Sequence, residues 1–304
     1  MVRQPASSPA NSSGVPSPLP KPHKAQAHTL GRCFRWRPSL FFPTKGPPLS
    51  DLMTLFADAT LPWTEMGFAA AAIFFAGALR AFAGFGFALA GVPLLALTVG
   101  PAAAVPMILL LEILSGLQML PVVRKAADWR SIWLILPAAI VAAPFGVYLL
   151  DVLSADALRI LIALTLLGAV ILMASGVKFP AKIPVPVTLG IGAASGLLAG
   201  STAMAGPPVL LYFLGRADTP NAARASMFMY FSLTGATTLA VGFFSGVVAS
   251  ETLILALMLA PALFLANLAG HGLFHAVGDK HYRPIALTLL TIIALATLWG
   301  AIGL

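Results

Sequence analysis

Long apolar segments alternate with short polar segments along most of this 304-residue chain. A helix that crosses a bilayer needs about 20 apolar residues, and each of these segments reaches that length. The pattern therefore predicts an all-α polytopic membrane protein with about eight transmembrane helices. The segments cover residues 66–99, 102–122, 131–150, 157–176, 185–215, 225–248, 252–276 and 284–304.

Two of these segments, 66–99 and 185–215, are longer than one crossing needs and are interrupted by glycine and proline. The second contains GLLAGSTAMAGPPVLLYFLGR, residues 196–216. Lipid supplies no hydrogen-bond partner for a peptide group freed at such a break, so the loosened backbone must lie in protein or against a cavity. Each segment is interpreted as a broken helix, either two half-helices with an unwound centre or a re-entrant hairpin.

The chain also contains an internal repeat. Gly146 and its surroundings match Gly270 at an offset of 124 residues, and GVPLL at 91–95 matches GPPVL at 206–210 at an offset of 115. Four crossings in each copy are an even number, so both copies are expected to enter the membrane from the same side, as parallel repeats. The predicted units are two four-helix repeats, each opened by a broken helix, over residues 65–176 and 184–304.

Composition agrees with a membrane protein and argues against a nucleic-acid partner. The chain is 59% hydrophobic and 9% charged, whereas soluble domains carry roughly 25% charged residues. The formal net charge is +8, but seven of the Lys and Arg residues and no Asp or Glu lie in residues 1–50. From Asp51 onward, eleven basic residues face ten acidic ones. The membrane body is therefore close to neutral, and no nucleic-acid partner is expected.

The N-terminal tail, residues 1–64, is rich in Pro, Ser and basic residues and lacks the continuous apolar run of a secretory signal peptide. It is predicted to be disordered. Its composition also fits an organelle transit peptide, and Met53 offers a second start site close to the first apolar segment. Cys33, the single cysteine, lies in this tail and gives no information about the redox compartment.

The charges of the loops predict an orientation in the membrane. With the N-terminus in the cytoplasm, the basic tail and the loops RKAADWR and VKFPAK fall on the cytoplasmic side, as the positive-inside rule requires. The loops GRADTPNAAR and GDKHYR also carry basic residues, yet this arrangement places them outside. The predicted topology thus leaves two loops in conflict with the rule.

The two breaks predict an anion-binding site. Broken helices place N-termini of half-helices inside the membrane, where unpaired N–H groups and the helix dipole attract anions. Ser201 and Thr202 can donate hydrogen bonds at the second break. The alternative is that the small residues at the breaks only allow helices to pack closely. The backbone positions predicted to complete the site are Gly84, Gly86, Gly91, Gly206 and Pro207.

Two charged residues lie deep in apolar segments. Arg80 follows fourteen residues of the first segment, and a cation at a helix centre costs roughly 2.5–3.5 kcal/mol on insertion scales. It is therefore expected to face the cavity and to bind an anionic partner. Glu112 lies centrally in the second segment and is the candidate proton carrier. The partner of Arg80 is either the substrate or, in a static ion pair, Glu112.

No cofactor and no metal site are predicted. His271 and His275 share a helical face, but they lie near a predicted membrane edge, where histidine is ordinary. The alternative to a carrier is a membrane-embedded enzyme that acts on lipid or headgroup substrates, for which only these histidines with Asp279 and His281 could serve. The sequence contains no G-x-S-x-G, H-E-x-x-H or phosphate-loop pattern, so no enzyme activity is predicted.

Four motifs follow one another along residues 66–304: FAGFGFALAGVPLLAL, RKAADWR, PFGVYLLDVLSADALRILIAL and GLLAGSTAMAGPPVLLYFL. In this order they resemble the sulfite exporter TauE/SafE family, of the toluene sulfonate uptake permease type. The resemblance implies a multi-pass permease of the bacterial inner membrane that moves sulfite, sulfonates or related anions as a secondary carrier. The expected partners are a small anionic substrate and the lipid bilayer, and the oligomeric state is left open.

The first break departs from the pattern of this family. It reads FGFALAG, where the family commonly has consecutive glycines. The bulky side chains of Phe85 and Phe87 therefore imply a narrower or more apolar pocket, which leaves the exact substrate undetermined.

Overall fold

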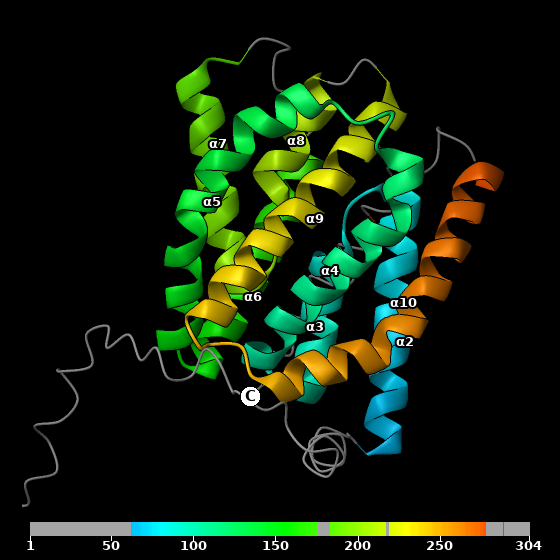
Figure 1. Ribbon diagram of the computed structural model, residues 1–304, viewed down its shortest axis with the longest axis vertical. Helices are drawn as coiled ribbons and strands as arrows, with labels where there is room; N and C mark the ends of the chain where they lie inside the picture. The colour runs from blue at the N-terminus through cyan, green and yellow to red at the C-terminus, as the bar shows by residue number, and fades with distance from the viewer. Residues whose placement is uncertain (1–61, 176–182, 217–218, 278–287, 289–304) are drawn as a thin grey trace, which may run out of the picture. The chain divides into compact units, whose positions relative to one another are not determined.

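The computed structural model describes residues 62–175, 183–216, 219–277 and 288, all within one compact unit, Leu49–Leu304. Within these ranges the regular secondary structure is entirely helical, as predicted (Figure 1). The helices are α2 (Trp63–Ala83), α3 (Phe87–Val99), α4 (Pro101–Val123), α5 (Trp129–Val152), α6 (Ala155–Ala174), α7 (Val185–Thr202), α8 (Gly206–Arg216), α9 (Pro220–Phe244) and α10 (Ser250–Val277).

Seven helices in the described residues are long and apolar enough to cross a membrane, namely α2, α4, α5, α6, α7, α9 and α10. They coincide with seven of the predicted apolar segments, and the shorter helices α3 and α8 form the second halves of the two interrupted ones. The predicted multi-pass membrane class is confirmed by these helices. The eighth segment, 284–304, lies outside the described residues except for residue 288, and its crossing stays a prediction.

The first break is a hairpin turn, not the unwound centre of a through-going helix. After α2 ends at Ala83, Gly84 and Gly86 take positive φ angles of 83° and 95°, which glycine adopts without steric penalty. α3 then runs back along α2, so that Ala76 lies 3.5 Å from the position that a Cβ on Gly91 would occupy. In a through-going helix these two residues would be separated by about 22 Å.

The second break turns in the same way. α7 ends at Thr202, and Ala203 takes a left-handed φ of 57°. The chain then passes back along α7, where the Ser195 hydroxyl donates to the carbonyl oxygen of Ala205 at 2.8 Å. Tyr230 of α9 donates to the Ser195 hydroxyl at 2.9 Å and so holds this turn against α9. Of the two interpretations of the breaks, the re-entrant hairpin is the one that the structure contains.

Glycines allow two pairs of helices to approach closely. Along α5 and α7, a Cβ on Gly196 would lie 2.1 Å from the carbonyl oxygen of Ala139. Along α2 and α10, a Cβ on Gly270 would lie 2.4 Å from the carbonyl oxygen of Ala78. No side chain fits at such distances from a neighbouring backbone. Part of the glycine content therefore serves helix packing, as it does in many membrane bundles.

These contacts also give the directions of the helices. Residue numbers rise together along α5 and α7 and along α2 and α10, so these pairs are parallel, whereas α4 and α9 are antiparallel. In Figure 1, α2 starts at the lower end of the bundle and α7 starts at the upper end. Parallel repeats require both to start from the same side, so the predicted parallel orientation is wrong. The physical reason is that each hairpin adds a reversal of the chain, which makes the number of passes in the first unit odd.

Most of the Lys and Arg residues in the described part of the chain belong to one end of the bundle. The ends of α4, α6, α8 and α10 and the starts of α5, α7 and α9 lie at the upper end in Figure 1. The described helix ends next to the two loops that conflicted with the predicted topology therefore lie at the same end as those next to the other basic loops. The Lys and Arg residues of this end, within the described residues, are Arg124, Lys125, Arg130, Arg216 and Arg224.

The opposite end of the bundle is acidic. Its described helix ends carry Glu65, Asp151, Asp156 and Glu251. Arg159 is the basic residue near these ends, and its guanidinium forms an ion pair with Asp156 at 2.6 Å. The two ends of the bundle therefore differ in the sign of their charge.

Candidate functional site

A buried arginine connects three helices. Arg80, close to the end of α2, is fully buried, and its Nη1 donates to Oε1 of Glu112 on α4 at 2.7 Å. Its Nη2 donates to the Ser232 hydroxyl at 3.0 Å and to the Phe228 carbonyl oxygen at 3.3 Å, both on α9. The guanidinium carbon also lies 4.0 Å from the centroid of the Phe228 ring, a cation–π contact. Charge, hydrogen bonds and stacking therefore fix the guanidinium in one place.

Arg80 and Glu112 neutralise one another in the core. Among the described residues they are the charged side chains in the buried set, with exposed fractions of 0% and 5%. Removing one partner of such a pair leaves an uncompensated buried charge and costs about 3–5 kcal/mol. Of the two partners considered for Arg80, Glu112 is the one present in this structure.

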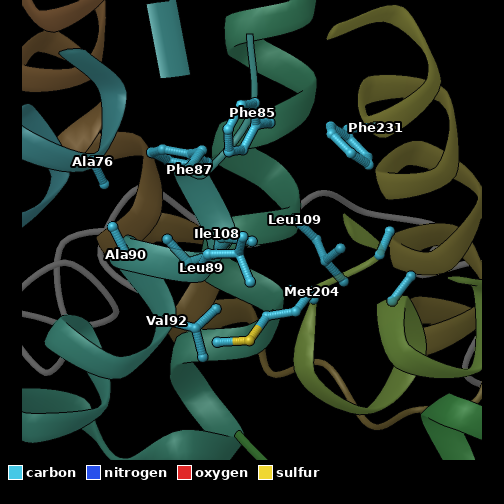
Figure 2. Close-up of a cluster of buried hydrophobic side chains, with 14 of the residues drawn as sticks. Ala76, Phe85, Phe87, Leu89, Ala90, Val92, Ile108, Leu109, Met204 and Phe231 are labelled. Atoms are coloured by element: carbon cyan, nitrogen blue, oxygen red, sulfur yellow. The ribbon is translucent and has the colours of Figure 1, made fainter. Parts of the chain in front are cut away.

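A cavity of about 20 Å³ lies between the two hairpin turns. Figure 2 shows apolar side chains of this region, with Phe85, Leu89, Met204 and Phe231 among those labelled. The volume is sufficient for about one water molecule, so a sulfur oxyanion does not fit without a movement of the walls. The lining residues are Phe85, Gly86, Ala88, Leu89, Glu112, Ala203, Met204, Ala205, Gly206, Leu210 and Phe231.

The N-terminal turns of α3 and α8 both border this cavity. Gly86 is the N-cap of α3, so the N–H groups of the turn that follows have no partner within the helix. Gly206 begins α8, where Pro207 and Pro208 follow without N–H groups. This second helix end therefore contributes mainly the positive end of its dipole. Two positive helix ends and the Glu112 carboxylate thus border one small space.

The comparison with known families agrees with this arrangement. The sequence profile of the sulfite exporter TauE/SafE family matches residues 69–297. The chain belongs to the sulfite exporter TauE/SafE family. The match begins within α2 and includes both hairpins, Arg80 and Glu112. Comparisons with curated proteins and with solved structures gave no match. The TauE/SafE match and the membrane-spanning helices together establish a multi-pass protein of a transporter family.

The predicted glycines of this TauE/SafE site lie in different surroundings. Gly86 and Gly206 border the cavity between the turns. Gly84 packs against Arg224, whose Cγ would lie 2.4 Å from an added Cβ. Gly91 lies in the second turn of α3, packs against α2 and α4, and is not part of the cavity lining. Two of the four glycines are therefore positioned for contact with a ligand in this cavity.

The predicted hydroxyl donors of the TauE/SafE site are engaged within their own helix. Ser201 and Thr202 donate to the carbonyl oxygens four residues earlier, at 2.9 and 2.8 Å. The Thr202 oxygen also accepts a hydrogen bond from the Met204 N–H at 3.3 Å, which stabilises the turn. Pro207 lies in the first turn of α8, next to Gly206, as its predicted role as a helix start requires. In this state the two hydroxyl groups direct their hydrogen atoms to the backbone and not to the cavity.

The sequence interpretation missed the contribution of α9. Phe228 and Ser232 hold the Arg80 guanidinium, and Arg224 donates to the carbonyl oxygen of Ala81 at the end of α2. Arg224 is therefore partly buried and packed against the end of α2. The spacing of 224, 228 and 232 by four residues places these side chains on one helical face, and this signal could have identified them.

No group of three or more His, Cys, Asp or Glu side chains that could hold a metal ion occurs within the part of the chain that the structure describes. The side chains of His275, Asp279 and His281 lie outside that part. The enzyme alternative that depends on them is thus not tested by the structure of this TauE/SafE protein.

Proposed function

We propose that this TauE/SafE protein is a secondary carrier that moves small sulfur oxyanions, of the sulfite or sulfonate class, together with protons across the bacterial inner membrane. The observation that carries the proposal is that Glu112 borders the cavity between the hairpin turns while its carboxylate pairs with the buried Arg80. A substrate anion in this small apolar space is repelled by the ionised carboxylate. Anion binding therefore requires Glu112 to take up a proton.

Protonation of Glu112 releases Arg80 for the substrate. The buried guanidinium then offers charge-assisted hydrogen bonds to an oxyanion, and the helix ends at Gly86 and Gly206 add positive potential. Linkage is reciprocal, so an anion that prefers the protonated protein also makes the protein bind its proton more tightly. Proton and anion thus cross the membrane as a pair, with the Arg80–Glu112 ion pair re-formed after release.

The small cavity volume implies an occluded state of the carrier. A space of about 20 Å³ becomes a substrate site only when its walls separate. Both walls are hairpin turns that meet at the cavity, so a displacement of either turn relative to α4 and α9 widens it. When one hairpin turn moves at a time, the substrate site opens alternately to the two sides of the membrane.

We further propose that the predicted units, 65–176 and 184–304, are inverted repeats. The correspondence pairs α2 with α7, α3 with α8, α4 with α9 and α5 with α10. Helix contacts support it, because α2 packs along α10 as α7 packs along α5, while α4 packs against its own counterpart α9. Units of this kind are related by an axis in the membrane plane and place the substrate site at their interface.

The end of the bundle that carries most Lys and Arg residues is assigned to the cytoplasm by the positive-inside rule. This assignment brings the described helix ends next to all four basic loops to one side and places the start of α2 outside. The N-terminal tail has little weight in the rule, because charges count mainly within about 20 residues of a helix end. Lys45 is the single basic residue of the tail within that distance of Trp63.

Cysteine labelling in spheroplasts tests this orientation. A Cys33→Ser background removes the single cysteine, and Asp156→Cys or Lys125→Cys then adds one exposed thiol at the acidic or the basic end. We expect a membrane-impermeant maleimide to label Asp156→Cys in intact spheroplasts and Lys125→Cys only after permeabilisation. The reverse pattern contradicts the orientation.

Uptake of labelled sulfite into liposomes tests the carrier function. The full-length protein is expected to give saturable accumulation above that of protein-free liposomes, and an acidic exterior is expected to increase the rate. Protein-free liposomes measure the leak of sulfite through lipid. A membrane-embedded enzyme instead gives chemical turnover of a lipid or headgroup substrate without accumulation of sulfite.

A further inference from the structure

Glu112 needs a path for its proton that the cavity between the hairpin turns does not supply. That cavity has a volume of about 20 Å³, which is sufficient for about one water molecule. Apart from Glu112, its side chains are those of Phe, Leu, Met and Ala residues, which carry no O–H or N–H group. A proton moves along a series of hydrogen-bonding groups, so its route is expected where polar side chains lead away from Glu112.

Polar side chains of this kind lie between α4 and α10. Ser115 follows Glu112 by three residues on α4, so the two share a helical face, with about 5–6 Å between their Cβ atoms. The amide N–H₂ of Asn267 on α10 donates to the Ser115 hydroxyl oxygen at 3.0 Å, and the Ser115 hydroxyl donates to Oδ1 of Asn267 at 3.3 Å. Both side chains are fully buried. A polar line, formed by Glu112, Ser115 and Asn267, therefore extends from the ion pair to α10.

The polar line leads to a second cavity. His271 follows Asn267 by four residues on the same face of α10 and borders this cavity, which has a volume of about 190 Å³. It shares no lining residue with the cavity between the hairpin turns. Val122 at the end of α4 and Asn221 at the start of α9 belong to its wall and are exposed. The second cavity therefore reaches the surface at the basic end of the bundle (Figure 1).

The second cavity is suited to hold water. Its volume is sufficient for several water molecules, and Arg224, Asn221 and His271 supply the polar partners that ordered water needs. Among its described lining residues, Arg224 and His271 are the ones that carry or can take up a charge, and α2 and α4 contribute apolar side chains. A positive charge on His271 is opposed by Arg224. Water is therefore better suited than a His271 cation to carry the proton through this space.

The Ser115 hydroxyl can connect this water with Glu112. Its hydrogen passes to the Glu112 carboxylate while its oxygen accepts a proton from a water molecule on the side of Asn267, so the hydroxyl is restored and carries no charge. The same two transfers in reverse return the proton to the water. Asn267 transfers no proton, but its N–H₂ group holds the Ser115 oxygen in place.

We propose that protons travel between Glu112 and the basic end of the bundle through Ser115 and the water of the second cavity, with Asn267 as the positioning residue. The substrate anion takes a different path, through the space between the hairpin turns. This inference rests on the proposed carrier function and adds the proton route to it. The alternative role of Ser115 and Asn267 is to hold α4 and α10 together, as interhelical hydrogen bonds do in membrane bundles.

Two rates of labelled sulfite movement in liposomes separate these roles. Net uptake requires Glu112 to gain and lose a proton in each cycle. Exchange of labelled for unlabelled sulfite, at a saturating concentration on both sides and equal pH, proceeds between loaded carriers in which Glu112 keeps its proton. Ser115→Ala is expected to lower the rate of net uptake by about tenfold or more and to leave the rate of exchange unchanged. An equal loss of both rates, or no loss of net uptake, overturns the proposal.

Three further variants locate the route. Ser115→Thr keeps a hydroxyl group at this position and is expected to retain net uptake. Ala126→Phe fills part of the second cavity, leaves the Ser115 hydroxyl in place, and is expected to slow net uptake but not exchange. Thr165→Val is the matched control, because it removes a buried hydroxyl of α6 that is outside the cavity lining and donates to the Leu161 carbonyl oxygen. Both rates are expected to stay unchanged in this control.

Ser115→Ala removes hydrogen bonds between two helices and can therefore lower the stability of the protein. Melting temperature in detergent identifies that case, and Ala126→Phe then carries the test, with undiminished net uptake as the result that overturns the proposal. The unsubstituted protein reports separately on the carrier function. Sulfite uptake by it, with the same ratio of net uptake to exchange in every variant, rejects the proton route alone. Absence of sulfite uptake by the unsubstituted protein rejects the carrier function, and the route with it.

Discussion

Replacing Arg80 with glutamine is expected to abolish sulfite uptake and to lower the free energy of unfolding by about 3–5 kcal/mol. The change removes the guanidinium that binds the substrate anion in the proposed cycle. It also leaves Glu112 buried without its ion-pair partner, and it releases the hydrogen bonds to Ser232 and the Phe228 carbonyl oxygen. Liposome uptake of labelled sulfite and thermal unfolding in detergent measure the two effects.

Two further variants separate binding from stability. Arg80→Gln combined with Glu112→Gln removes both buried charges, so it is expected to regain most of the stability but none of the uptake. Arg159→Gln is the matched control, because it breaks an ion pair with Asp156 whose side chains are 44% and 71% exposed. Such surface pairs contribute about 0–1 kcal/mol, so little change is expected. Uptake by the double variant at the unsubstituted rate would make Arg80 a structural residue only.

Replacing Glu112 with glutamine is expected to remove the stimulation of sulfite uptake by an acidic exterior. Glutamine has nearly the same shape and can still accept a hydrogen bond from Arg80, but it carries no titrating proton. Uptake at a fixed total sulfite concentration, measured over a range of external pH, shows the difference.

Sulfite itself titrates near neutral pH, so a change of external pH alters the substrate as well as Glu112. Glu112→Gln and the unsubstituted protein are therefore compared at each pH, where the substrate has the same protonation. Glu65→Gln changes an exposed carboxylate at the acidic end and is expected to keep the full stimulation. A Glu112→Gln protein with undiminished stimulation would leave Glu112 as a static partner of Arg80.

The helices and the need of Arg80 for an anionic partner could be predicted from the sequence because each depends on a local rule, whereas the choice between Glu112 and the substrate as that partner stayed open. About 20 apolar residues suffice to define a crossing, and clusters of glycine and proline mark where helices end. Arg80 and Glu112 stand out because a charge deep in an apolar segment needs a partner. Seven helices that are long and apolar enough for the predicted crossings are present in the structure, and Glu112 is the partner of Arg80 there.

The direction of the chain after each break was not predictable in the same way. Glycine and proline end a helix, but they do not determine whether the chain continues across the membrane or turns back. The length of α2 indicated a turn back, because its 21 residues extend over about 31 Å and are enough to cross a bilayer without α3. The two loops that violated the positive-inside rule were the other signal, because the hairpins bring the described helix ends beside them to the basic end.

The roles of individual residues at the breaks depended on contacts that the sequence does not contain. Ser201 and Thr202 were predicted to be ligand donors, yet hydroxyls inside a helix commonly donate to the preceding turn, as both do here. The match of GVPLL with GPPVL paired Pro93 with Pro208. In the structure Pro93 lies inside α3, whereas Pro208 lies in the first turn of α8. Residues that the repeat alignment pairs therefore occupy different positions in the two hairpins.

The proton movement that sulfite drives tests the coupling of Glu112 to transport most directly. Liposomes containing the protein and a trapped pH-sensitive dye receive an inward sulfite gradient, and protein-free liposomes give the background of unassisted diffusion. The unsubstituted protein is expected to acidify the interior more per labelled sulfite taken up than Glu112→Gln does, because the protons that sulfite itself releases are the same for both proteins. Equal acidification per labelled sulfite by both proteins would contradict the exchange of Glu112 and substrate at Arg80.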